Sequence, residues 1–163
     1  MALDDRSELL NRARRDELRE RASLAIVRLR QRIEAVEELH DCPCCGYLTL
    51  VGFLDICSLC GWQDDGQDDP AALEVRGGPN QDLSLDEARK NFARHGAMYR
   101  ADDEQTCIEL ELCNEKRVVI ADFDAALEAP SDNDVVAALC EALNGMRSLS
   151  AHRIRLSWEQ DPR

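Results

Sequence analysis

Five of the eight cysteines lie in or beside two copies of one short pattern. The copies are Cys42-Pro-Cys-Cys45-Gly46 and Cys57-Ser-Leu-Cys60-Gly61, each C-x2-C-G, and eleven residues separate them. Two residues between the cysteines let one turn direct both thiolates at a single ion, and the glycine allows the positive φ with which the chain turns back. Two such knuckles supply the four thiolates of a closed tetrahedral shell. The sequence therefore predicts one structural Zn²⁺ bound by Cys42, Cys45, Cys57 and Cys60.

Other uses of these thiols are weaker hypotheses. Free or disulfide-bonded thiols are one alternative, and a C-x-x-C redox pair is another. A redox pair would account for only one of the two C-x2-C patterns, whereas a metal site accounts for both. Cys44 is the odd thiol, because adjacent Cys44 and Cys45 would bind one ion only with strain. His40 is close enough in sequence to be a rival ligand. We expect the three remaining cysteines to be small buried apolar residues; they are Cys107, Cys113 and Cys140.

The sequence gives little support for an enzyme. Four thiolates leave no open coordination position for water or substrate. No phosphate-binding glycine loop, no G-x-S-x-G and no H-E-x-x-H pattern occurs. The acidic run Asp64–Asp69 lacks the spacing of an EF-hand and is better interpreted as a solvated loop or a surface that faces a cation. A nucleophilic role for Cys44 is the remaining enzyme hypothesis.

The segment around the knuckles is rich in turns. Residues 42–100 contain seven of the eight glycines. Tyr47–Val51 and Phe53–Ile56 are expected to be the strands of a short hairpin. Ser84-Leu-Asp-Glu87 is a capping box, so a helix should begin there, run to His95 and end at Gly96.

The flanking segments are predicted to be helical. Residues 1–41 lack Gly and Pro, and apolar residues recur at steps of three and four, which predicts a helix over Ser7–Leu39. Thr106–Glu128 is expected to be a helix, although part of it alternates like a strand. A further helix should run from Asn133 to about Leu143 and end near Gly145, and Arg153–Trp158 could be a strand or an irregular end. The apolar stripe of the first helix consists of Ala22, Ile26, Leu29, Ile33 and Val36.

Together these expectations describe an α-rich α+β fold in three stretches. Residues 1–41 form an amphipathic helix, residues 42–100 a small four-cysteine zinc ribbon with a short β-hairpin, and residues 101–163 a mostly helical extension. The first helix could pack on the rest of the protein, associate with itself or bind a partner.

The net charge of the chain limits the classes of partner that it is expected to bind. Its 33 acidic and 20 basic residues give a net charge of −13. This charge opposes general binding to nucleic acid or to an anionic membrane, and it suits a basic partner or simple solubility. The chain has no apolar run near the roughly 20 residues of a membrane-spanning helix and no signal-peptide pattern, so a cytoplasmic location is expected.

The segment 42–100 resembles the bacterial CPCC family of cysteine-rich proteins. The resemblance rests on both knuckles, the acidic run ending at Pro70, Gly77-Gly-Pro-Asn80 and Leu83–Phe92, and Gln63 departs from the glutamate more usual after Trp62. It implies a zinc-ribbon-like domain of unsettled function. Family members are often small cytoplasmic bacterial proteins, and some are encoded beside toxins and immunity proteins.

Three classes of function follow. The first is an immunity protein that binds a basic toxin and covers its active or substrate-binding surface. Its expected contacts are Asp64–Asp69 and the N-terminal helix, with Trp62, Tyr99 and Trp158 as candidate anchors. The second is a regulatory or nucleic-acid-binding zinc ribbon, which eight arginines between Arg12 and Arg32 favour. Acidic residues interleaved with these arginines nearly cancel their charge, and the 23 acidic against 11 basic residues of 42–163 also oppose this class. The third is an enzyme.

Overall fold

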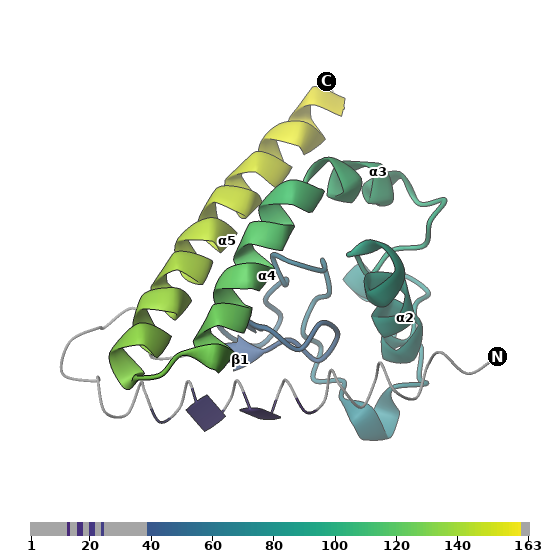
Figure 1. Ribbon diagram of the computed structural model, residues 1–163. Helices are drawn as coiled ribbons and strands as arrows, with labels where there is room; N and C mark the ends of the chain where they lie inside the picture. Colours follow the sequence, from purple (N-terminus) through teal and green to yellow (C-terminus); the bar gives the residue numbers. More distant parts are fainter. Residues whose placement is uncertain (1–12, 14–15, 18–19, 22–23, 25–38, 161–163) are drawn as a thin grey trace.

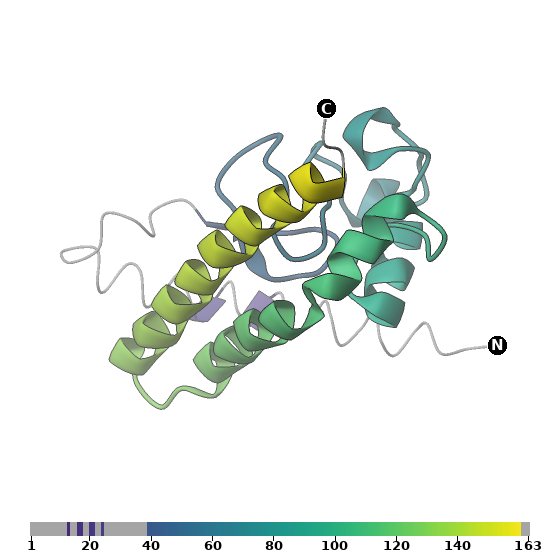
Figure 2. The same ribbon diagram turned by 90° about the horizontal axis from the view of Figure 1, so that it is seen from above.

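The computed structural model describes residues 39–160, together with residues 13, 16–17, 20–21 and 24. Helices α4 and α5 lie side by side and antiparallel, and the loops that carry the cysteines lie between this pair and α2 (Figures 1 and 2). None of the described helices is long and apolar enough to span a membrane. The elements are β1 (His40–Asp41), β2 (Leu48–Leu50), the short 3-10 helices η2 (Asp69–Ala71) and η3 (Gly78–Asn80), α2 (Leu85–His95), α3 (Glu104–Glu111), α4 (Cys113–Glu128) and α5 (Asp132–Gln160).

The helix predicted over Ser7–Leu39 lies almost wholly outside the described residues and stays a prediction. Among the described residues of this segment, Arg21 and Leu39 both contact the rest of the chain. The Arg21 guanidinium donates to the carbonyl oxygen of Ala129 at 3.1 Å, just beyond the C-terminus of α4. A cation there complements the negative end of the helix dipole.

The Ser84 half of the capping box predicted for α2 is confirmed, whereas the Glu87 carboxylate accepts hydrogen bonds from Arg100 at 2.7 and 3.1 Å. The Ser84 hydroxyl accepts a hydrogen bond from the amide of Glu87 at 3.1 Å, at the start of α2. At the other end Gly96 adopts the left-handed conformation, with φ of 79°, and its amide donates to Phe92. Both ends of α2 therefore lie where the sequence predicted them.

The predicted hairpin is present, but its strands are partly different. β1 pairs with β2 across the first knuckle, whereas the prediction of a strand over Phe53–Ile56 is wrong. The Asp55 carboxylate accepts hydrogen bonds from the amides of Val51 and Ile56, and Leu54 has a φ of 68°, so the chain turns here instead of extending. Only an isolated bridge between Ile56 and Gln63 remains.

The C-terminal region is more helical than predicted. Thr106–Glu128 is helical as expected, in two helices that meet at Leu112. The predicted end near Gly145 is wrong, since α5 continues to Gln160, and the tail is neither strand nor irregular. A Cβ on Gly145 would lie 2.7 Å from Cγ2 of Val119 on α4. The glycine therefore serves close packing of the two helices and does not end α5.

The knuckles and the C-terminal helices share one hydrophobic core. The rings of Tyr47 and Phe123 lie 5.4 Å apart between centroids, which joins the first knuckle to α4. Leu59 and Trp62 of the second knuckle region are fully buried in the same cluster as Leu139 of α5. The packing of α4 and α5 is thus tied to the cysteine loops.

Candidate metal centre

The structure brings the four predicted ligands together. The Sγ atoms of Cys42, Cys45, Cys57 and Cys60 all lie within 4.8 Å of one another, and the four residues are 0–1% exposed. Cys42 and Cys60, and likewise Cys45 and Cys57, have their sulfurs 3.6 Å apart, far beyond the about 2.05 Å of a disulfide. A tetrahedral ion with Zn–S bonds of about 2.3 Å has S–S edges of about 3.8 Å. The cluster therefore fits one tetrahedral ion.

The two knuckles have the same backbone. The amide of Cys42 donates to the backbone carbonyl of Tyr47 at 2.9 Å, and the amide of Cys57 donates to that of Trp62 at 2.8 Å. Inside each turn the glycine amide donates to the carbonyl of the first cysteine at 2.9 Å. Both glycines have a positive φ, 81° at Gly46 and 88° at Gly61. The repeated C-x2-C-G pattern thus produces two equivalent turns that face each other across the sulfurs.

Polar groups around Sγ of Cys57 favour the thiolate of this residue. The amide of Cys60 donates to Sγ of Cys57 at 3.4 Å, and the Thr49 hydroxyl lies 3.0 Å from the same sulfur. Burial raises the pKa of Cys42, Cys45 and Cys60, whereas at Cys57 the effect of burial is outweighed by the neighbouring thiols and Thr49, which lower its pKa. Four buried thiolates need a cation to offset their charge.

An arginine from a helix contacts each knuckle. Nε of Arg89 on α2 donates to the carbonyl of Pro43 at 2.8 Å, and Nη2 of Arg153 on α5 donates to the carbonyl of Ser58 at 2.6 Å. Pro43 and Ser58 both directly follow the first cysteine of their knuckle. The two contacts are therefore equivalent.

Carboxylates hold both guanidinium groups in place. Arg153 donates twice to Glu109, at 2.6 and 2.9 Å, and Glu109 also pairs with Lys116. Glu109 and Lys116 are buried, with side chains 2% and 5% exposed. Although burial lowers the pKa of Arg153, the hydrogen bonds and charge of Glu109 raise it overall.

Arg89 is held by ion pairs, and its Nη2 makes no hydrogen bond within the described part of the chain. Its Nη2 lies 2.7 Å from a carboxylate oxygen of Asp69 and 3.6 Å from one of Asp68. A third aspartate of the acidic run, Asp65, pairs with Arg76 at 3.9 Å. Part of this run therefore positions arginines, which the sequence interpretation as a solvated loop did not include.

The other predicted candidates lie outside the group of four. Cys44 is buried, and burial raises the pKa of its thiol, but its sulfur is not part of the cluster. His40 is exposed on β1. The expected burial of the three scattered cysteines is wrong, because Cys107 is exposed and Cys113 and Cys140 are only half-buried. No other group of potential metal ligands forms within the described residues.

Sequence reasoning missed both arginines. Arg89 lies in the stretch that resembles the CPCC family, yet nothing in its local pattern points to Pro43, 46 residues away. Arg153 contacts Ser58 across 95 residues of sequence. Such contacts are set by how α2 and α5 pack, which no local pattern shows.

Residues 40–111 match the family model described as Cysteine-rich CPCC. The match spans a little under half of the chain and includes both knuckles, α2 and α3. It supports the assignment of this segment to the cysteine-rich CPCC family. No curated protein and no solved structure matches the chain. The family and the four-cysteine cluster together indicate a metal-binding protein.

Proposed function

We propose that this chain is a zinc-binding immunity protein, which binds a basic bacterial toxin and covers its active or substrate-binding surface. The observation that carries the proposal is an apolar loop directly outside a closed metal centre. This inter-knuckle loop, residues 51–56, leaves four large apolar side chains exposed. Exposed apolar clusters of this kind mark protein-binding surfaces. The side chains are Val51 (60% exposed), Phe53 (72%), Leu54 (53%) and Ile56 (54%).

Backbone contacts hold the inter-knuckle loop in shape. The amide of Leu54 donates to the backbone carbonyl of Asp64 at 2.9 Å, and the Gln63 side chain donates to the backbone carbonyl of Leu54 at 2.9 Å. A left-handed φ at a leucine costs roughly 1–2 kcal/mol. Leu54 is thus strained, exposed and held by hydrogen bonds. Such a residue is suited to contact a partner in the conformation it already has, so that little entropy is lost on binding.

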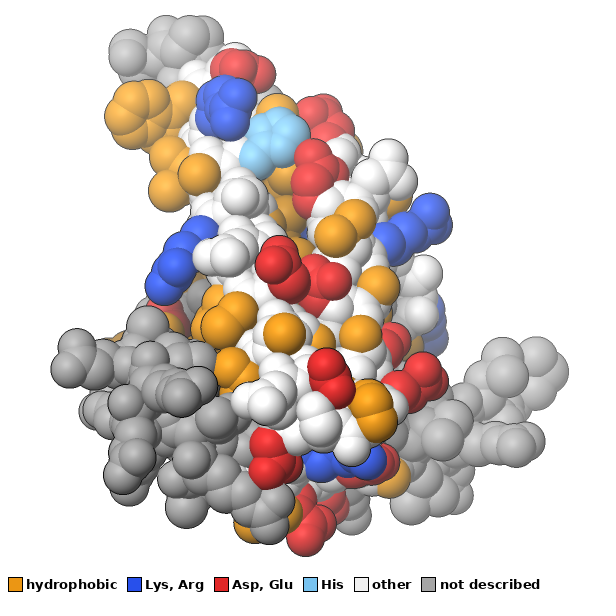
Figure 3. Space-filling model, turned by 60° about the vertical axis from the view of Figure 1, so that its left-hand side comes forward, with side chains coloured by type: hydrophobic (Ala, Val, Ile, Leu, Met, Phe, Trp, Pro, Cys, Tyr) orange, Lys and Arg blue, Asp and Glu red, His pale blue; other side chains and the backbone are white. Residues whose placement is uncertain are grey.

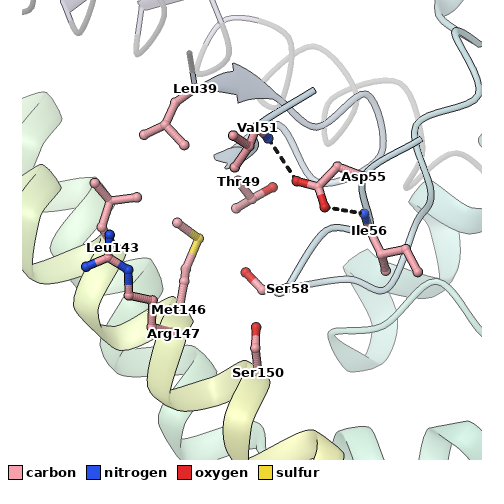
Figure 4. Close-up of a pocket in the computed structure, with 10 residues that line it drawn as sticks. All are labelled: Leu39, Thr49, Val51, Asp55, Ile56, Ser58, Leu143, Met146, Arg147 and Ser150. Atoms are coloured by element: carbon pink, nitrogen blue, oxygen red, sulfur yellow. Dashed lines mark hydrogen bonds between the residues drawn. The ribbon is translucent and has the colours of Figure 1, made fainter. Parts of the chain in front are cut away.

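A pocket of about 480 Å³ lies between this loop and α5 (Figure 4). Val51 and Ile56 line it on one side and Met146 on the other, and the buried hydroxyl of Ser58 has no hydrogen-bond partner among the described residues. A partner side chain with an apolar body and a polar end suits this lining. The remaining lining residues are Leu39, Thr49, Asp55, Leu143, Arg147 and Ser150.

The charge distribution favours a basic partner. Asp64 and Asp65 directly follow Gln63, which forms a β-bridge with Ile56 of the inter-knuckle loop. The whole chain carries a net charge of −13. Acidic side chains are also spread over the side of the molecule that α5 forms, with basic ones mostly toward its edges (Figure 3). Rim charges of this kind mainly raise the association rate, so that rate should fall steeply with added salt.

The role of the metal in this proposal is structural. Four cysteines are the ligand set of structural zinc sites, and a shell completed by protein ligands has no position for a substrate. The chain would therefore act by binding and not by catalysis. When bound, zinc would link the two knuckles from which the inter-knuckle loop projects.

The structure changes which aromatic residues are candidate contacts. Trp62 is fully buried, so its prediction as a contact residue is wrong. Tyr99 is half-buried and packs against Gly61. Trp158, 76% exposed near the end of α5, remains a candidate.

Co-expression with a basic toxin encoded beside this gene tests the proposal. We expect growth to be rescued and the two proteins to co-elute from a sizing column. Phe53→Ser should weaken the complex at least tenfold, whereas Leu73→Ser, at an 81% exposed leucine outside the loop, should not. Failure to rescue growth, with no complex formed, would contradict the immunity function and favour a regulatory zinc ribbon.

A further inference from the structure

We propose that Arg89 and Arg153 are a matched pair of positioning residues for the metal centre. Each tethers the carbonyl that follows the first cysteine of one knuckle, and each brings a positive charge to the cluster of thiolates. The inference rests on metal binding at the four cysteines, as the proposed function does, but it does not depend on the toxin.

The equivalence of the two contacts is the first argument. The knuckles have the same backbone hydrogen bonds, and the arginines reach the same position of each, Pro43 in one and Ser58 in the other. They come from different helices, α2 and α5, at unrelated distances in sequence. Tethering this carbonyl fixes the turn, and in the second knuckle that turn also directs the amide of Cys60 to Sγ of Cys57 at 3.4 Å.

The balance of charge is the second argument. A divalent ion with four thiolates has a net charge of −2, and it would lie in a buried site where uncompensated charge is costly. Both arginine side chains are largely buried, 16% exposed at Arg89 and 21% at Arg153. Each guanidinium group also contacts carboxylates, so the two arginines offset the charge of the loaded centre only in part.

The surroundings of the arginines predict which one matters more. Glu109 neutralises only one of the two cations that contact it, Arg153 and Lys116, so this cluster keeps a net positive charge. Arg89 instead faces two aspartates, Asp68 and Asp69. The electrostatic contribution to the metal centre should therefore be larger from Arg153.

Substitutions in the full-length chain test the proposal. Arg89→Gln and Arg153→Gln remove the charge and the tether, and Arg153→Gln still leaves Glu109 paired with Lys116. Arg89→Lys and Arg153→Lys restore the charge with a single donor group. The matched controls are Arg94→Gln on α2 and Arg155→Gln on α5, both at exposed arginines.

Two measurements are made on each variant. Competition with a chelator gives the Zn²⁺ affinity, and we expect each Gln variant to bind about 10- to 100-fold more weakly at an unchanged one-to-one ratio, as is typical for residues behind metal ligands. The Lys variants should recover part of this loss. In the Co²⁺-loaded protein, loss of a nearby cation should move the thiolate-to-cobalt absorption band to longer wavelength.

The outcomes separate this inference from the proposed function. Gln variants that bind zinc as tightly as the controls would overturn it, and so would weaker binding with an unchanged cobalt band, since that pattern indicates general loss of structure. If the unsubstituted chain bound no metal, the metal centre and this inference would fall together. If it bound metal and no toxin, only the immunity function would fall.

Discussion

Gly61 combines two constraints at one residue. Its φ of 88° strains any residue with a side chain, and a Cβ there would lie 3.0 Å from the ring of Tyr99. Gly61→Ala should therefore destabilise the second knuckle by about 1–3 kcal/mol and weaken metal binding.

Gly52→Ala is the matched control for this change. Nothing lies within 4 Å of a Cβ at Gly52, and its φ is not positive. Chemical denaturation of both variants with metal bound should show a change below about 0.5 kcal/mol for Gly52→Ala. Equal stability of the two variants would contradict this view of the knuckle.

Tyr99 should titrate at an unusually high pH. Burial, and then the negative charge of Glu109, raise the pKa of Tyr99 to about 12. Because the unfolded phenol has a pKa of about 10, the folded state favours the neutral form. The resulting stabilisation is complete below pH 10 and is lost as the pH rises through 12.

Ultraviolet titration measures this behaviour. The spectrum of the Tyr99→Phe variant is subtracted from that of the unsubstituted chain, which leaves the signal of Tyr99. We expect almost no tyrosinate absorbance from this residue at pH 10.5. Half-ionisation near pH 10 would show that the ring is solvated.

Single residues show which parts of the site could be predicted from the sequence. The four ligands could be predicted because C-x2-C-G is a local pattern whose spacing follows from one turn. Trp62 was predicted as a candidate contact with a partner, whereas its ring is fully buried, because no local pattern shows which aromatic side chain joins the core. Arg89 and Arg153 could not be predicted, since their partners are set by tertiary packing.

Among the elements, the α4–α5 pair depends on one glycine. Gly145→Ala gains up to about 1 kcal/mol of helix propensity but places a methyl group 2.7 Å from the stiff side chain of Val119. Overpacking costs typically about 1–3 kcal/mol, so we expect a net loss of stability. Denaturant unfolding of the single variant measures it.

A double-mutant cycle identifies the cause of this loss. Val119→Ala removes the atom that the new methyl group would meet, so Gly145→Ala should cost less in its presence, by at least about 0.5 kcal/mol. Additive effects of the two substitutions would mean that the helices do not approach closely at this point.

The same glycine explains an error in predicting the elements. Capping signals around α2 were sufficient, because Ser84 and Gly96 act on their own helix. Gly145 resembles a helix end in sequence, yet its role lies in a contact between two helices. The Phe53–Ile56 segment failed as a strand because Asp55 binds the backbone on both sides of the turn.

At the scale of the whole molecule, the metal centre and the helices should loosen together. Trp62 is fully buried in the shared core, whereas Trp158, the other tryptophan, is 76% exposed. In a Trp158→Phe variant the fluorescence reports on Trp62 alone. Removal of the metal with a chelator should shift its emission to longer wavelength, because the free energy of binding a structural ion is also free energy of folding.

The corresponding measurement on the helices is hydrogen exchange. We expect α4 and α5 to lose protection when the chelator is added, since Phe123 packs on Tyr47 next to the first knuckle. Unchanged emission of Trp62 together with full protection of both helices would show that the fold does not require the metal.

Native mass spectrometry of the full-length chain tests most directly whether the four cysteines form one closed zinc site. The chain and its Cys44→Ser variant, purified under reducing conditions, should each carry one Zn²⁺, because Cys44 lies outside the group of four sulfurs. Cys45→Ser and Cys57→Ser should carry none. A chain without zinc, a disulfide between Cys57 and Cys60 under these conditions, or loss of zinc from Cys44→Ser as complete as from Cys45→Ser would contradict a zinc site formed by Cys42, Cys45, Cys57 and Cys60.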